Sequence, residues 1–200
     1  MKKNIQIAYI ALFFLSLMIS PVSATTGPQE QLRPTLSRLV EILGDADLKG
    51  DENKKERRNI IMTTISERFD FGEMSKRVLG ATWRDINEEQ RKNFTIQMTK
   101  LLENNYIGQL ENYSGETIEY VGERVKEDRA QVSTLIENNN VKYPVHYIMT
   151  EKDGKWMVYD INIEGVSLIR NYRAEFSSIL RTEKFDGLME ILKEKNQSFE

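Results

Sequence analysis

The sequence predicts an α+β fold in which about six helices wrap a curved, four-stranded antiparallel sheet. Three observations lead to this prediction. Apolar residues recur with helical spacing over 28–112, the period changes to two over 117–163, and helical spacing returns over 168–195. The chain has 200 residues, which is the size of one domain and is long enough to bury a sizeable core.

The first 24 residues are expected to be an export signal. Two lysines precede an apolar run over 5–19, and small residues stand at the −3 and −1 positions before a cleavage after Ala24. A run of about 15 residues is shorter than the roughly 20 that a bilayer-spanning helix needs. We therefore expect residues 1–24 to be a cleaved secretory signal peptide and residues 25–200 to form the mature, soluble domain.

Four helices are expected before the sheet. Apolar residues at helical spacing mark a first helix over 28–45 and a second over 52–69. A short helix over 74–79 is expected to end at Gly80, because glycine is common at helix C-termini. The long helix after Asn87 is the clearest of the four, because Asn87 and the glutamine three residues later have the spacing of a capping box.

Four strands are expected near 117–126, 129–137, 141–150 and 155–163. Val, Ile, Thr and Tyr are frequent in these segments, and short turn-forming sequences separate them. Alternate residues of the third segment, beginning at Val141, form an apolar face. The fourth segment is apolar on both alternations, which predicts packing against both of its faces.

The chain is expected to return to helix after the sheet. Gly165 ends the fourth strand, and Ser167 is placed to cap a helix over 168–182. A last short helix is expected over 185–195, where leucine and isoleucine recur at helical spacing.

The composition argues against several classes of function. The chain has no cysteine, which excludes disulfides, thiolate metal sites and cysteine nucleophiles, and its one histidine excludes multi-histidine metal sites. The net charge is −3, and it becomes −5 without the two signal lysines, which argues against a nucleic-acid partner. Gly-rich phosphate loops and serine nucleophile motifs are also absent from the sequence. These features point to a domain without catalytic equipment, metal or cofactor.

Two side chains remain as catalytic candidates. His146 is either a base in a cavity lined by the sheet or an ordinary strand residue. Asp160 is either a general base in an apolar pocket, as in cone-shaped α+β isomerases, or a structural carboxylate. The structural alternative is an ion pair with Arg77, Arg84 or Arg173. We favour the structural interpretation of both residues, because no second acid, base or oxyanion donor accompanies them in the sequence.

Two blocks of the sequence resemble the toluene-tolerance family, also called the MlaC family. The first block begins with FDFGEMSKRVLG at 69–80 and continues to Phe94. The second begins with WMVYD at 156–160 and continues with IEGVSL at 163–168. The resemblance covers essentially the whole mature chain, and it departs from the family at 182–184, where small, Gly-containing sequence is frequent.

This resemblance implies a soluble periplasmic carrier of phospholipid that acts as a monomer and is not an enzyme. The implied fold is a twisted four-stranded sheet with six or seven surrounding helices and a deep apolar pocket for acyl chains. The implied partners are an inner-membrane MCE-domain ring with an ABC permease and ATPase, and an outer-membrane lipoprotein associated with a porin.

The wall of the implied pocket is expected to come from residues in or beside the two blocks. Each of these residues also has the competing interpretation of ordinary core. They are Leu79, Trp83, Phe94, Leu102, Tyr106, Val132, Tyr147, Val166, Leu168, Tyr172 and Phe176. Arg84 and Arg173 are expected either near the pocket mouth, where a guanidinium can bind a phosphate, or in structural salt bridges.

Three other functions stay open at this point. The chain would look similar if it carried another lipid, such as a hopanoid. An enzyme of the cone-shaped α+β type would use Asp160 as its base. A protein-interaction module would have a filled core and carry no ligand.

Overall fold

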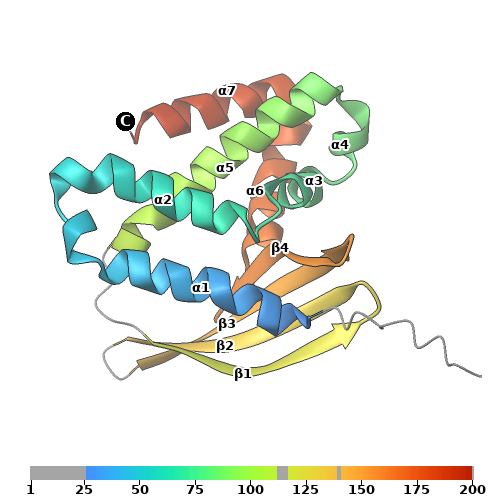
Figure 1. The fold of residues 1–200 in the computed structure, drawn as a ribbon. Coiled ribbons are helices and arrows are strands. Elements are labelled where there is room, and N and C mark those ends of the chain that lie inside the picture. Colours follow the sequence, from blue (N-terminus) through green and yellow to red (C-terminus); the bar gives the residue numbers. More distant parts are fainter. Residues whose placement is uncertain (1–25, 112–116, 139–140, 200) are drawn as a thin grey trace, which may run out of the picture.

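The computed structural model describes residues 26–111, 117–138 and 141–199 (Figure 1). The expected signal peptide and its cleavage after Ala24 lie outside these residues. The elements before the sheet are α1 (Pro28–Gly44), the short 3₁₀ turns η1 (Ala46–Leu48) and η2 (Asp51–Asn53), α2 (Lys54–Ser66), α3 (Phe71–Leu79), α4 (Thr82–Asp85) and α5 (Glu88–Glu111). The remaining elements are β1 (Thr117–Lys126), β2 (Arg129–Asn138), β3 (Val141–Lys152), β4 (Lys155–Ile163), β5 (Val166–Ser167), α6 (Leu168–Thr182) and α7 (Lys184–Gln197).

The α+β prediction is confirmed, with one strand more than expected. The sheet is antiparallel throughout, with strand order β1-β2-β3-β4-β5. The fifth strand holds two residues, Val166 and Ser167, which pair with the end of β4. Two residues are too few to show a period of two, so periodicity could not predict this strand.

A β-bulge explains most of the apolar pattern of β4. Val158 pairs with Met149, and Ile161 pairs with Tyr147. Because Tyr147 and Met149 lie two residues apart on one face of β3, Val158 and Ile161 also share that face. The register shift leaves one extra residue in β4, so residues on opposite alternations reach the same side of the sheet. The extra residue, Tyr159, is also buried, beneath the guanidinium of Arg77, and packing against both faces of β4 stays a prediction.

The predicted caps place two helices correctly. Asn87 Oδ1 accepts a hydrogen bond from the Gln90 backbone N–H at 2.9 Å, and Gln90 Oε1 accepts one from the Asn87 N–H at 3.0 Å. Ser167 Oγ accepts from the Arg170 N–H at 3.0 Å, at the start of α6. These bonds satisfy backbone donors that have no partner within the helix, and they fix where α5 and α6 begin.

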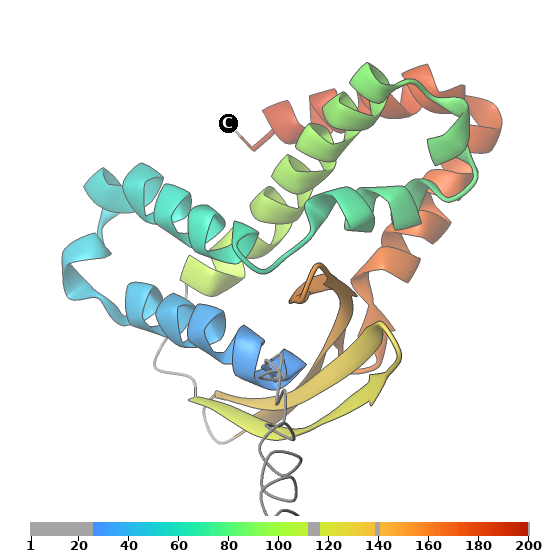
Figure 2. The ribbon, with the colours of Figure 1, turned by 45° about the vertical axis from the view of Figure 1, so that its right-hand side comes forward.

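The helices lie over the concave face of the sheet. In Figures 1 and 2, α1 crosses this face, α6 runs from β4 toward α7, and α5 and α7 pack together farther from the sheet. Phe94 of α5 and Phe176 of α6 meet edge to face there, with ring centroids 6.2 Å apart. Within the described residues, no helix is both long enough and apolar enough to cross a bilayer.

The segment between α2 and α3 is attached to β4. The Asp70 N–H donates to the Val158 carbonyl at 2.8 Å, and the Val158 N–H donates to the Arg68 carbonyl at 2.8 Å. Gln31 of α1 is bonded to the same junction. Its Oε1 accepts hydrogen bonds from the Trp156 N–H at 2.9 Å and from the Arg68 guanidinium at 3.0 Å. The start of α1 and the end of α2 are therefore both held against the sheet.

Asp70 makes the stability of this junction depend on pH. Its carboxylate caps α3 by accepting from the Glu73 N–H at 2.8 Å, and it pairs with Lys152 Nζ at 2.5 Å. Burial alone would raise the pKa of Asp70, but the hydrogen bonds from Lys152 and from the backbone outweigh burial and lower the pKa. The stabilisation is therefore present above the ordinary pKa of 3.8 and is lost as the pH falls through the lower pKa of the folded protein.

We expect the wild-type chain to lose more unfolding free energy between pH 5 and pH 2 than Asp70→Asn does, because the variant has no carboxylate to protonate. Urea unfolding at a series of pH values measures the difference. Asp51→Asn, at an exposed position, is the control and should follow the wild-type slope. Parallel curves for the wild type and Asp70→Asn would contradict this account.

Candidate functional site

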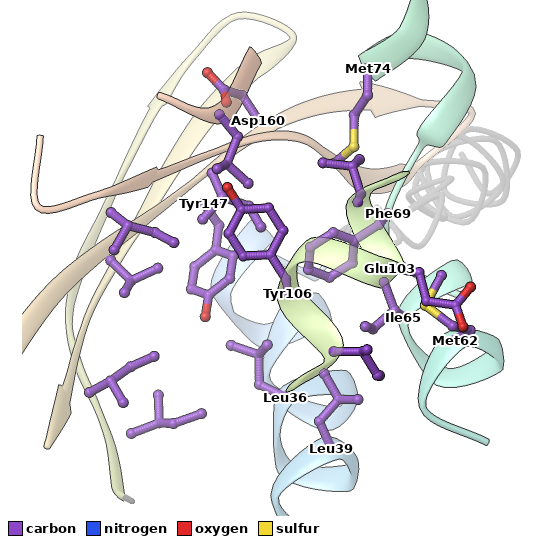
Figure 3. A pocket seen from close by; sticks show the side chains of 18 of the residues that line it. Leu36, Leu39, Met62, Ile65, Phe69, Met74, Glu103, Tyr106, Tyr147 and Asp160 are labelled. Atoms are coloured by element: carbon purple, nitrogen blue, oxygen red, sulfur yellow. The ribbon is translucent and has the colours of Figure 1, made fainter. Parts of the chain in front are cut away.

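A cavity of about 540 Å³ lies between the concave face of the sheet and the helices (Figure 3). Residues from α1, α2, α3, α5 and α6 and from the four long strands line it, and most of them are aliphatic or aromatic. Its volume is within the range of about 300–1,000 Å³ that is typical of small-molecule sites. The structure thus contains an apolar pocket inside the fold.

The wall formed by α1 comes from one stripe of the helix. Leu36, Leu39, Val40 and Leu43 line the cavity, and their spacing of three and four residues places them on one helix face. Two turns of α2 face the same space through Met62 and Ile65. Figure 3 shows Leu36, Leu39, Met62 and Ile65 on neighbouring helices, around the lower part of the pocket.

The wall formed by the sheet follows the alternation of β3. Tyr143, Val145 and Tyr147 line the cavity, because every second side chain of a strand points to the same face. Their ladder partners extend the wall on both sides: Ile136 of β2 is opposite Tyr143, and Ile161 of β4 is opposite Tyr147. The bulge in β4 is what brings Ile161 to this face.

Phe69 lines the pocket from the segment that is bonded to β4. Its ring meets that of Tyr147 edge to face, with centroids 6.5 Å apart and an interplanar angle of 89°. Tyr106 of α5 lies close to this pair in Figure 3. The backbone bridge between Phe69 and Val158 therefore also positions an aromatic wall residue.

Two phenols of the pocket, Tyr106 and Tyr147, are uncharged at neutral pH. Burial and the neighbouring Tyr172 raise the pKa of Tyr106 to about 12, and burial also raises the pKa of Tyr147. Among the described residues, the charged ones of the lining are Glu103, Asp160 and Glu164, and none of the lining residues is Lys or Arg. In the part of the chain that the structure describes, no group of three or more His, Asp or Glu side chains is arranged to hold a metal ion.

Asp160 has a structural role at the start of α6. Its two carboxylate oxygens accept from Ser167 Oγ at 2.6 Å and from the Ile169 N–H at 3.1 Å. These bonds replace the ion pair with an arginine that we expected, and they tie β4 to the helix. His146 points away from the pocket-lining face of β3, and its Nδ1 lies 3.0 Å from Ser133 Oγ.

Four of the predicted wall residues line the cavity. They are Leu102, Tyr106, Tyr147 and Leu168. Tyr172 lies one layer behind, where its hydroxyl bonds to that of Tyr106 and accepts from Asn105 Nδ2 at 2.8 Å.

The other predicted wall residues do not belong to the cavity lining. Leu79, Phe94 and Phe176 are buried among the packed helices, with at most 4% of each side chain exposed. Val132 is fully buried beside Tyr147 in the ladder, without reaching the cavity. These residues belong to the packed hydrophobic core.

The remaining predicted residues are near the surface. Trp83 of α4 is half-buried beneath the Arg91 guanidinium, and Val166 of β5 is 58% exposed. Arg84 is exposed on α4. Arg173 is exposed on α6. Its guanidinium lies against Gly80, 3.0 Å from the point that a Cβ atom on residue 80 would occupy. Neither arginine lines the cavity, so the expected position near its mouth is not seen.

Sequence reasoning missed most of the residues that line the cavity. The α1 stripe, with Leu36 and Leu39, and the apolar face of β3, with Val145, were visible as periodic patterns. Such patterns show which face is buried, but not whether the opposite side chains meet or leave a space. The spacing of these residues therefore showed that they are buried, but it did not show whether they line a pocket or fill the core.

Three comparisons place the chain among known proteins. The sequence model of the family described as MlaC protein matches residues 33–194. The intermembrane phospholipid transport system binding protein MlaC of Haemophilus influenzae is 24% identical over 172 residues, which cover 83% of this chain and 80% of that protein. A phospholipid-binding protein from Ralstonia solanacearum, solved in complex with a phospholipid, matches the fold with a TM-score of 0.81 and 25% identity, over 87% of this chain and 99% of that one.

The family match spans most of the chain, including both blocks on which the resemblance was based. The structural match extends the agreement to the fold as a whole. The chain belongs to the MlaC family.

Proposed function

We propose that this protein is a periplasmic carrier that holds a phospholipid by its acyl chain in the apolar pocket and moves it between membranes. The observation that carries this proposal is the cavity of about 540 Å³ with aliphatic and aromatic walls. The Haemophilus influenzae relative named for intermembrane phospholipid transport and the phospholipid-bound relative from Ralstonia solanacearum support the same ligand class.

The cavity has room for at least one acyl chain. A methylene takes up about as much space as a water molecule, roughly 30 Å³, so a volume of about 540 Å³ holds a chain of ordinary length. Each buried methylene contributes about 0.8 kcal/mol, so a chain of some 15 methylenes gains roughly 12 kcal/mol on leaving water. Such a ligand stays bound during diffusion through an aqueous compartment.

Release from so stable a complex requires a partner. A partner shifts the equilibrium only if it binds the open or empty state better than the loaded one, or offers the lipid a competing apolar surface. The partners we propose are an inner-membrane MCE-domain ring with an ABC permease and ATPase, and an outer-membrane lipoprotein with a porin. The net charge of −5 on the proposed mature chain disfavours lasting adhesion to anionic membranes.

Native mass spectrometry of the exported protein, followed by organic extraction, tests the proposal. We expect a bound mass of about one phospholipid per chain, with phospholipid in the extract. Extraction of a hopanoid would identify a carrier of another lipid. A stable protein that carries no lipid after purification and takes none from vesicles would overturn the proposal in favour of an interaction module.

The bonds of Asp160 favour a carrier over an enzyme, and they lead to a prediction. Asp160→Ala is expected to lower the unfolding free energy by about 1–3 kcal/mol, because the Ile169 N–H loses its acceptor in a partly buried place. Bound phospholipid per folded chain is expected to stay near the wild-type value. Urea unfolding and lipid extraction measure the two quantities, with Glu190→Ala at an exposed position of α7 as the control. A variant with unchanged stability would contradict the structural role.

A further inference from the structure

The charged side chains of the pocket lining all have the same sign. In the part of the chain that the structure describes, the charged lining residues are Glu103, Asp160 and Glu164, which are all acidic, and no Lys or Arg lines the pocket. By sequence, the segments 112–116 and 139–140, which precede the lining strands β1 and β3, contain no Lys or Arg either. A polar group that enters together with an acyl chain therefore meets carboxylates and no cation in the wall.

Glu103 is the carboxylate of this set that is available to a ligand. The oxygens of Asp160 already accept hydrogen bonds from Ser167 and Ile169. Glu164 is exposed, so its carboxylate keeps its hydration by water. Within the described residues, Glu103 makes no hydrogen bond or ion pair. It is half-buried on α5, three residues before Tyr106, and Figure 3 shows its carboxylate beside Met62.

A carboxylate in this position is poised for a cation. It is half-buried and lies beside Met62 of α2, so it has lost part of its hydration without gaining a partner among the described residues. The same partial exclusion of water strengthens its attraction for a positive group and its repulsion of a negative one. The ammonium at the end of a zwitterionic head group, beyond the glycerol and the phosphate, would restore the missing interaction.

We propose that Glu103 receives the ammonium of a zwitterionic head group, so that the pocket prefers lipids that carry an ammonium over lipids whose head group is only negative. This inference rests on the proposed function, since it selects among phospholipids. Glu103 acts as a specificity residue at the edge of the pocket, while the apolar walls hold the acyl chain of either lipid.

Competitive loading tests the inference. The delipidated mature chain is incubated with vesicles of equimolar phosphatidylethanolamine and phosphatidylglycerol, and the bound lipids are extracted and quantified. We expect the wild type to take up about ten times more phosphatidylethanolamine, and the ratio to fall toward one in Glu103→Gln with total lipid unchanged. Glu103→Lys is expected to reverse the preference.

Glu89→Gln is the matched control, because it makes the same change in net charge at an exposed position of α5. It should keep the wild-type ratio, which separates a pocket effect from repulsion between the whole protein and anionic vesicles. Equal uptake of both lipids by the wild type, or an unchanged ratio in both Glu103 variants, would overturn the inference and leave the carrier function standing. A wild-type chain that takes up neither lipid would overturn the proposed function as well.

Discussion

A variant whose pocket is filled by two tryptophans, Leu39→Trp on α1 and Val145→Trp on β3, is expected to lose at least nine-tenths of its bound phospholipid. Both residues line the cavity, one from the helix wall and one from the sheet wall. The added rings occupy space that the acyl chain needs. Overpacking a filled core costs about 1–3 kcal/mol, but here the empty volume of about 540 Å³ gives the rings room, so the fold should survive.

Lipid extraction and native mass spectrometry measure the loss, and circular dichroism checks the fold. The matched control is Ile96→Trp with Val125→Trp, which places the same side chains at positions more than half exposed on α5 and β1. This control should carry as much phospholipid as the wild type. A folded pocket-filled variant with about one phospholipid per chain would show that the lipid binds elsewhere.

Phe176→Ala is expected to have the opposite profile, with a large loss of stability and intact lipid binding. Phe176 is 2% exposed and contacts the rings of Phe94 and Tyr172, with centroids 6.2 and 5.7 Å away. Removing such a ring costs about 3–5 kcal/mol, through lost burial and the cavity left behind. Because Phe176 is not part of the pocket lining, the chains that remain folded should keep their phospholipid.

Urea unfolding of the delipidated protein measures the stability, and lipid per folded chain is measured well below the midpoint of the transition. Ile191→Ala, at a position 38% exposed on α7, is the control and should change the unfolding free energy by much less. Loss of lipid from folded Phe176→Ala would place this residue in the binding site after all.

Helix-capping residues and the periodic spacing of apolar residues predict most of the fold, because both depend only on residues that are close in the sequence. The Asn87 capping box and the Ser167 cap depend on residues within one turn, so their positions can be read without knowing the rest of the chain. The start of α3 was missed by three residues, because Asp70 caps it while also bonding to Lys152 of β3. That ion pair joins residues 82 positions apart, which no local pattern reports.

The bulge of β4 shows the same limit in the sheet. Regular alternation places Val158 and Ile161 on opposite faces, whereas the ladder with Met149 and Tyr147 places both on the concave face. A bulge depends on how two strands fit together, and the sequence of one strand does not contain that information. The wall of the pocket changes with it, because Ile161 lines the cavity.

By itself, the sequence determined the α+β class, the order of the main elements, their caps and the two blocks of the MlaC family. The tertiary structure decided which buried residues form the pocket. Leu36 and Phe176 are exposed by only 4% and 2%, yet Leu36 lines the cavity and Phe176 lies in packed core. The physical reason is that periodicity reports the burial of a side chain, whereas a cavity depends on whether the side chains opposite fill the space between them.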